Sequence, residues 1–362
     1  MTIENDLAAV AADPLQALAC PSPRFAGAEV SSLIRDRYGL KATLRPLVSE
    51  RDQNFHAVCD DSSEFVIKIA NSVEPEDVTD FQIQALLHIE RSGCPVPVPR
   101  VLRTQDGAIA TEIRDGDVAH ICRVVSYLPG TPIADLAQSA TLAENLGVSL
   151  AQLGIALADF EHAGDRQVLL WDLQRAGALH GLLGYIHERE LHDRVAACLV
   201  DFEQRVAPYL AALRGQVIHS DAHGSNVLAG QDGETITGII DFGDMLRAPL
   251  IMDVAIAAAY LRGEGADPLQ LITPFVAGYH GVMRLDALEI DLLFDLVRAR
   301  LAATITISRW RIAARGADDA YSLESAASER SAEHFLAALD GTARARFTAR
   351  IRAACGLPKA RA

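Results

Sequence analysis

The first third of the chain alternates short apolar runs with turns, and two helical stripes interrupt the alternation. AGAEVSSLIRDRYGL repeats apolar residues at helical spacing and stops at Gly39. ATLRPLV, NFHAVCD and EFVIKIA follow, and their β-branched and aromatic content predicts antiparallel strands joined by tight turns. An apolar stripe after Pro75 predicts a helix that ends at Gly93, and the strand-like runs AIATEI and DVAHICRVVSYL complete the region.

After Pro129-Gly130 the pattern becomes helical and rich in Ala and Leu. It stays helical over 131–162 and 171–213, and again from Pro249 onward. Between these stretches, QVIHSDAHGSNVLAG and TITGIIDFGD return to strand and loop character. Several strands with one inserted helix, followed by many helices, predict an α+β protein. The expected domains are an N-terminal lead-in (1–25), an N-lobe (26–127) and a mostly helical C-lobe (128–362).

Composition narrows the range of partners. The chain of 362 residues carries 33 basic and 48 acidic residues, a formal charge of 33 − 48 = −15. This charge repels nucleic acid and anionic membranes, so neither is an expected partner. The most apolar run, Pro249 to Leu261, contains Asp253 and is too short to span a bilayer. Six scattered cysteines without a CxxC pair, and an opening segment without a basic leader, predict a cytoplasmic protein.

The strongest chemical signal lies at two strand ends. QVI leads into a loop that carries Asp221 and Asn226, and GII leads into Asp241. Together these side chains form an all-oxygen ligand set, which suits Mg²⁺. Phosphoryl transfer needs little more than a group to orient the attacking hydroxyl, metal on the phosphates and a nearby cation. Asp253 lies within an apolar run and must be hydrogen-bonded or paired, so we expect it to hold the loop that carries Asp221.

The spacing H-x-D-x-x-x-x-N of HSDAHGSN, followed by IIDFGD, resembles the aminoglycoside phosphotransferase family, also called choline-kinase-like. The resemblance implies a two-lobed, protein-kinase-like fold with an antiparallel-sheet N-lobe and one main helix in it. It implies that Asp221 is the catalytic base and that Asn226 and Asp241 are the metal ligands. His219 would brace the loop through hydrogen bonds. The chance alternative is that Asp and Asn are simply favoured at turns.

The same resemblance assigns a nucleotide site to the N-lobe. Lys68, a lone cation in EFVIKIA, would contact phosphates of ATP or GTP, and the alternative is an edge-strand lysine that faces solvent. SERDQNF would cover the nucleotide through Ser49 and Asn54, although it lacks GxGxxG. The backbone of the hinge would bind the base at Ser126, Tyr127 and Leu128. Gln84 stands where a glutamate should pair with Lys68, so either Glu90 or another acid substitutes, or the lysine is oriented differently.

Longer strings, including IIDFGDMLRAPLIMDVAIAAAY and RLAATITISRW, resemble the hydroxylysine kinase branch of the family over about residues 28–330. This resemblance implies transfer from GTP or ATP to the hydroxyl of 5-hydroxylysine or a related small hydroxylated amine. Asp172 and Asp244 are candidates for the ammonium groups, and Arg309 for the carboxylate. The alternatives are that Asp172 caps a helix, that Trp171 only packs, and that Arg309 pairs with a surface acid.

Two other functions stay open at this stage. An aminoglycoside or homoserine-type kinase would share the fold and the catalytic residues. A nucleotide-binding pseudokinase module is the alternative from another class, which Gln84 leaves open. The natural acceptor, the choice between ATP and GTP, and the state as monomer or homodimer are not fixed by the residues.

Overall fold

The computed structural model describes residues 20–263, 265, 267–316 and 319–358, so most of the predicted lead-in (1–25) lies outside the described residues. The chain divides into two compact units. Unit 1 comprises Met1–Phe81, Val101–Ser126 and Ala163–Leu170. Unit 2 comprises Gln82–Arg100, Tyr127–His162 and Trp171–Ala362.

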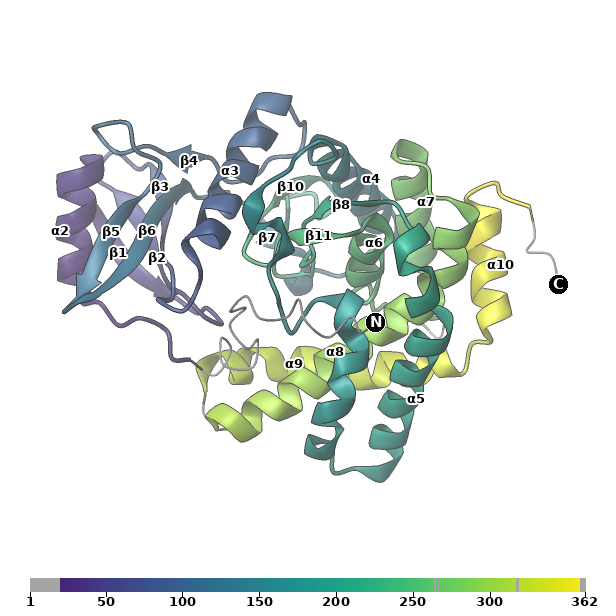
Figure 1. Cartoon of the computed structure of the whole chain (residues 1–362). Helices are drawn as coiled ribbons and strands as arrows, with labels where there is room; N and C mark the ends of the chain where they lie inside the picture. Colours follow the sequence, from purple (N-terminus) through teal and green to yellow (C-terminus); the bar gives the residue numbers. More distant parts are fainter. Residues whose placement is uncertain (1–19, 264, 266, 317–318, 359–362) are drawn as a thin grey trace, which may run out of the picture. The chain divides into compact units, whose positions relative to one another are not determined.

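Unit 1 is built on an antiparallel sheet, as the alternating runs predict (Figure 1). The strands pair in the order β1-β2-β3-β6-β4, and β5 also pairs with β6. Their bounds are β1 (Ala42–Leu47), β2 (Gln53–Cys59), β3 (Glu64–Ile69), β4 (Val101–Leu102), β5 (Thr111–Asp115) and β6 (Val118–Ser126). In this register Lys68 on β3 stands opposite Asn54 on β2 and Arg123 on β6.

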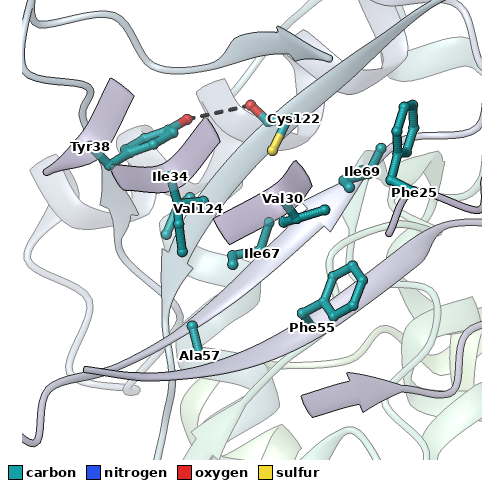
Figure 2. Packing of buried hydrophobic residues seen from close by; sticks show 10 residues of the cluster. All are labelled: Phe25, Val30, Ile34, Tyr38, Phe55, Ala57, Ile67, Ile69, Cys122 and Val124. Atoms are coloured by element: carbon teal, nitrogen blue, oxygen red, sulfur yellow. Dashed lines mark hydrogen bonds between the residues drawn. The ribbon is translucent and has the colours of Figure 1, made fainter. Parts of the chain in front are cut away.

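One helix, α2 (Gly27–Tyr38), packs its apolar stripe against this sheet (Figure 2). Val30, Ile34 and Tyr38 are spaced four residues apart and are all buried, which is the face expected of an amphipathic helix. Every second residue of the neighbouring strands packs against this helix face, because alternate side chains of a strand point to the same face of the sheet. These sheet residues are Phe55, Ala57, Ile67, Ile69, Cys122 and Val124. The helix ends at Gly39, whose φ of 72° a residue with a side chain rarely adopts.

Helix α3 (Glu76–Ser92) follows Pro75 and stops before Gly93, as predicted, and its residues divide between the two units after Phe81. The predicted helices of unit 2 are also present. They are α4 (Ala140–Ala156), α5 (Arg189–Arg205), α6 (Leu250–Ala258), α7 (Ile272–Val282), α8 (Ala287–Arg315), α9 (Ala320–Asp340) and α10 (Arg344–Ala354). None of the helices in the described ranges is both long and apolar enough to cross a bilayer.

Short 3₁₀ segments connect these elements, and one of them corrects the expected pattern. They are η1 (Ile133–Asp135), η2 (Ala163–Arg166), η3 (Leu173–Tyr185) and η4 (Ala207–Ala212). The stretch that begins at Trp171 was expected to be regular helix, but η3 consists of 3₁₀ turns with a kink at Arg175. Three glycines in LQRAGALHGLLGY explain the difference, since glycine is the poorest helix former after proline.

The strand and loop region of unit 2 forms two small antiparallel ladders (Figure 1). Their strands are β7 (Thr131–Pro132), β8 (Gly215–Ile218), β9 (Val227–Ala229), β10 (Ile236–Ile239) and β11 (Leu246–Pro249). β9 pairs with both β10 and β7, and β8 pairs with β11. Helix α6 starts directly after β11, and every one of its residues is buried. This buried helix and the ends of β8 and β10 position the candidate site.

Candidate active site

The loop after β8 is held by a carboxylate from α6. Asp253 is buried, and its two oxygens accept hydrogen bonds from the backbone N–H of Ser220 at 2.8 Å and of His219 at 3.3 Å. Burial raises the pKa of Asp253. Ser220 has a φ of 64°, the left-handed conformation that costs a residue with a side chain free energy. The carboxylate thus fixes a strained turn immediately before Asp221.

His219 joins this loop to the end of β10. Its ring is fully buried, and its Nδ1 accepts the backbone N–H of Asp221 at 3.3 Å. Because Nδ1 accepts, the ring proton is assigned to Nε2, which lies 3.0 Å from the carbonyl oxygen of Ile240. Phe242 packs edge-on against the ring, with the centroids 4.8 Å apart. His219 therefore places the residue before Asp241 beside the loop of Asp221.

Asp221 and Asn226 contact each other directly. The carboxamide nitrogen Nδ2 of Asn226 lies 2.8 Å from Oδ2 of Asp221 and 3.0 Å from its backbone oxygen. Because Nδ2 is turned toward Asp221, the oxygen Oδ1 of the same carboxamide faces the opposite side. The backbone oxygen of Asn226 accepts the N–H of Ile240 at 2.9 Å. Ile240 is thus held between Asn226 and His219, with Asp241 next in the chain.

Two further cationic or titratable groups surround the Asp221 carboxylate. Nη2 of Arg300 lies 3.2 Å from Oδ1, and Nε2 of His223 lies 3.4 Å from Oδ2. Burial by itself would raise the pKa of Asp221, but the neighbouring His223 and Arg300 outweigh it and lower the pKa. The carboxylate is therefore ionised near neutral pH and can accept a hydrogen bond from a hydroxyl group.

Asp241 is exposed and has a φ of 61°, so it too adopts the left-handed conformation. Strained residues of this kind concentrate at functional sites. Asp244, three residues further on, is buried. Two of the non-glycine residues with positive φ in the described chain, Ser220 and Asp241, thus adjoin the candidate ligand set.

The oxygen donors fit a hard divalent cation. Asn226 Oδ1 and the Asp241 carboxylate are the ligand types that Mg²⁺ takes from proteins, alongside several waters and substrate phosphates. Within the described ranges, no group of three or more His, Cys, Asp and Glu residues could hold a metal ion by itself. A cation here would therefore rely on water and phosphate oxygens for the remaining ligands.

The predicted nucleotide residues are placed as follows. Lys68, Asn54, Ser49 and Ser126 belong to unit 1, whereas Tyr127 and Leu128 belong to unit 2. Lys68 and Asn54 are register partners on neighbouring strands, and Ser49 lies just after β1. The buried Oδ1 of Asn54 has no hydrogen-bond partner among the residues that the structure describes. A nucleotide site that uses all six residues stays a prediction.

The expected partner of Lys68 also stays a prediction. Gln84 belongs to unit 2, and Lys68 belongs to unit 1. Glu90, the considered substitute, forms an ion pair with Arg100 at 2.8 Å.

The predicted substrate residues have other contacts. Asp172 caps η3, and its Oδ1 accepts the backbone N–H of Gln174 at 3.0 Å, which corresponds to the capping alternative. The Arg309 guanidinium pairs with three carboxylates, at distances of 2.7 to 3.4 Å. These are Glu188, Glu329 and Glu333. A substrate carboxylate at Arg309 would have to replace one of them.

Sequence reasoning missed Arg300, Tyr260 and His223. Arg300 comes from α8 and is only 2% exposed. Its guanidinium carbon lies 4.8 Å from the centre of a Trp171 ring. Trp171 therefore makes a cation–π contact with an arginine of the protein itself. Arg300 directly precedes the apolar stretch LAATITIS, and this was a visible signal, because a buried charge needs partners. His223 contacts both Asp221 and Asn226.

Comparison with known proteins gives a consistent result. The model of the phosphotransferase enzyme family matches residues 43–289. The chain is similar to hydroxylysine kinase of Danio rerio, at 28% identity over 313 residues, which cover 83% of this chain and 88% of that one. It is also similar to hydroxylysine kinase of Mus musculus, at 28% identity over 320 residues, 82% of this chain and 85% of that one.

Two solved structures share the fold. The amicoumacin kinase complex superposes with a TM-score of 0.65 at 16% identity, covering 88% of this chain and 95% of that one. The microcompartment-associated aminopropanol kinase superposes with a TM-score of 0.59 at 17% identity, covering 92% of this chain and all (100%) of that one. At such identities the likeness concerns the fold alone, and it confirms the predicted protein-kinase-like architecture.

Proposed function

The chain belongs to the phosphotransferase enzyme family and is a kinase that phosphorylates a hydroxyl group. On this premise we propose that its acceptor is a hydroxylated amino acid or amino alcohol, such as 5-hydroxylysine. The hydroxylysine kinases of two vertebrates support this acceptor class, because the similarity extends over most of both chains. The phosphate donor in this proposal is GTP or ATP, used with Mg²⁺.

The observation that carries the catalytic assignment is the contact between Asn226 and Asp221. A carboxylate that accepts from Nδ2 of Asn226 at 2.8 Å and from Nη2 of Arg300 at 3.2 Å is held in one orientation. We assign Asp221 as the group that orients the acceptor hydroxyl and receives its proton on a carboxylate oxygen. A lowered pKa suits this role, since phosphoryl transfer has a loose transition state in which positioning matters more than a strong base.

The metal-holding role is assigned to Asn226 and Asp241. The oxygen Oδ1 of Asn226 faces away from Asp221, and Asp241 follows Ile240, which is bound to the Asn226 backbone. When bound, Mg²⁺ neutralises phosphate charge. The amicoumacin kinase structure contains AMP-PNP and Ca²⁺, which supports the use of a divalent cation with a nucleotide in this fold.

We keep the nucleotide contacts as the family resemblance implies them. Lys68 would contact its phosphates, and Asn54, opposite Lys68 in the sheet, would donate from its carboxamide nitrogen. Ser49 lies in the connection between β1 and β2, and Asn54 lies in β2. Backbone groups from Ser126 to Leu128 would bind the base.

A nucleotide-consumption assay tests the acceptor assignment. Purified protein is assayed with Mg²⁺ and either GTP or ATP against 5-hydroxylysine, ethanolamine, choline, homoserine and kanamycin. We expect turnover with 5-hydroxylysine and its close analogues, and none with Asp221→Asn, which serves as the matched control for contaminating kinases. Turnover of kanamycin alone would assign the chain to the antibiotic kinases instead. Nucleotide binding without turnover of any acceptor would identify a pseudokinase module.

A further inference from the structure

Arg300 is a buried cation whose hydrogen bonds are incomplete. It is 2% exposed, and Nη2 donates to Oδ1 of Asp221 at 3.2 Å and to the Tyr260 hydroxyl at 3.3 Å. The other two nitrogens, Nε and Nη1, are buried and have no hydrogen-bond partner among the described residues. The guanidinium therefore presents one satisfied nitrogen and two unsatisfied ones.

Unsatisfied N–H groups of a buried charge are costly. A buried donor without a partner loses its hydration without compensation, and the loss is larger when the donor belongs to a charged group. Trp171 and Tyr260 reduce this cost in part, with ring centres 4.8 Å and 5.6 Å from the guanidinium carbon. Aromatic faces do not accept the in-plane N–H bonds of a guanidinium as an anionic oxygen does, so the two nitrogens remain suited to an anion.

Two further arginines lie against the rings of Tyr260 and Trp171. The guanidinium carbon of Arg262 lies 4.9 Å from the Tyr260 ring centre, and that of Arg311 lies 5.8 Å from a Trp171 ring centre. Three arginines thus share two aromatic side chains, and one of these arginines, Arg300, contacts Asp221, in a chain whose net charge is −15. This concentration of cations disfavours an ammonium group at this position and favours a carboxylate or a phosphate.

We propose that Arg300 binds the carboxylate of the acceptor substrate, so that the enzyme selects a hydroxylated amino acid over the corresponding amino alcohol. The inference rests on the proposed function and names the substrate class more narrowly. Nη2 of Arg300 touches Asp221, so one side chain links the recognised carboxylate to the group that orients the hydroxyl. The terminal phosphate of the nucleotide offers similar anionic oxygens. The experiment below therefore distinguishes a substrate carboxylate from a nucleotide phosphate as the ligand of Arg300.

The test compares two acceptors in two enzymes. 5-Hydroxylysine and its decarboxylated counterpart, 1,5-diaminopentan-2-ol, are assayed with the native protein and with Arg300→Gln. Any general effect of the substitution on Asp221 acts on both acceptors and cancels in the ratio of their kcat/KM values. We expect the preference for 5-hydroxylysine to fall by roughly 10- to 100-fold, as for loss of a charge-assisted hydrogen bond, mainly through KM.

Two outcomes would overturn the inference. Equal losses on both acceptors would show that Arg300 serves the nucleotide phosphate or Asp221 only. A preference lost in Arg309→Gln but kept in Arg300→Gln would assign the carboxylate to Arg309. Arg300→Lys, which retains the charge, should recover part of the preference, and thermal unfolding of each variant confirms that it is folded.

A binding measurement separates this inference from the proposed function. L-lysine and cadaverine lack the reacting hydroxyl and differ only in the carboxylate, so calorimetric titration with a non-hydrolysable nucleotide present reports recognition without turnover. We expect the native protein to bind lysine more tightly and Arg300→Gln to lose that difference. If the native protein phosphorylates both acceptors equally well and binds both ligands alike, only this inference fails. If it neither phosphorylates nor binds any of the four compounds, the proposed function fails with it.

Discussion

The Asp253 carboxylate accepts a 2.8 Å hydrogen bond from the backbone N–H of Ser220, a residue 33 positions earlier whose φ is 64°. A residue with a side chain holds this conformation only when its surroundings fix it. Here the fixing group is a buried carboxylate on α6, which also accepts the N–H of His219. The position of Asp221 therefore depends on a carboxylate that binds the backbone of the two preceding residues.

We expect Asp253→Ala to destabilise the protein and to abolish turnover. The substitution leaves two buried backbone N–H groups without an acceptor, which should lower the free energy of unfolding by about 2–4 kcal/mol. Asp253→Asn keeps one acceptor oxygen and should cost less. Urea denaturation measures both, with the exposed Glu161→Gln as a control that should stay near the native value. An alanine variant as stable and active as the native protein would disprove the role of Asp253.

Replacement of Asp221 should separate catalysis from nucleotide binding. Asp221→Ala removes the group assigned to receive the hydroxyl proton, so kcat should fall by about 10²–10⁴. The Kd for the nucleotide should change little, because Asn226 and Asp241 are retained. Single-turnover kinetics and equilibrium nucleotide titration check the two expectations. Ser225→Ala, an exposed neighbour in the same loop, should leave both quantities near native.

Asp241→Asn should instead affect the metal-dependent part of nucleotide binding. An amide in place of a carboxylate removes a charge from the assigned ligand set, so more Mg²⁺ should be needed for half-maximal nucleotide binding. Nucleotide titration at rising Mg²⁺, and again with EDTA, measures this shift. In EDTA the native protein and the variant should bind the nucleotide similarly. A native-like Mg²⁺ dependence in Asp241→Asn would rule out Asp241 as a ligand.

The elements that sequence predicts well are those that a local pattern specifies. The stripe of Val30, Ile34 and Tyr38 is readable without the fold, and so is the stop at Gly39. Asp221 and Asn226 are five residues apart in one loop, and their contact follows from a short-range spacing.

Contacts made by long-range packing are not readable in this way. Arg300 reaches Asp221 across 79 positions and Tyr260 across 40, and no periodicity in the chain predicts that these side chains meet. Sequence reasoning named Arg309 as the candidate for the carboxylate and did not consider Arg300. In the folded chain Arg309 pairs with three carboxylates, whereas Arg300 is buried and contacts Asp221.

The stability of the protein in acid should depend on Asp201. Its carboxylate on α5 receives a hydrogen bond from Arg298 on α8 and lies 3.4 Å from Nη2 of Arg344. Burial alone would raise the pKa of Asp201, but these arginines outweigh it and lower the pKa. A carboxylate whose pKa is lower in the folded state contributes stability above its unfolded pKa, near 4, and loses it as the pH falls through the folded value.

We therefore expect Asp201→Asn to lower the free energy of unfolding at pH 7 by about 1–2 kcal/mol. The difference from the native protein should shrink as the pH falls from about 4 through the folded pKa, because the native carboxylate becomes protonated there. Urea denaturation at several pH values measures it. Asp36→Asn, at an exposed pair with Arg35, should change neither stability nor its pH dependence. A difference that stays constant down to pH 2 would show that Asp201 acts through packing and not through charge.

Two glycines let helices α4 and α7 approach closely, and their replacement should be costly. A Cβ added to Gly278 would lie 2.3 Å from the backbone oxygen of Glu144, and one added to Gly147 would lie 2.0 Å from that of Phe275. Both contacts are with rigid backbone, so Gly278→Ala should lower the free energy of unfolding by about 1–3 kcal/mol despite alanine's higher helix propensity. Gly281 lies on the same helix with nothing within 4 Å of its added Cβ, so Gly281→Ala should stabilise by up to about 1 kcal/mol. Opposite signs for these two variants in urea denaturation would confirm the close approach, whereas stabilisation by both would contradict it.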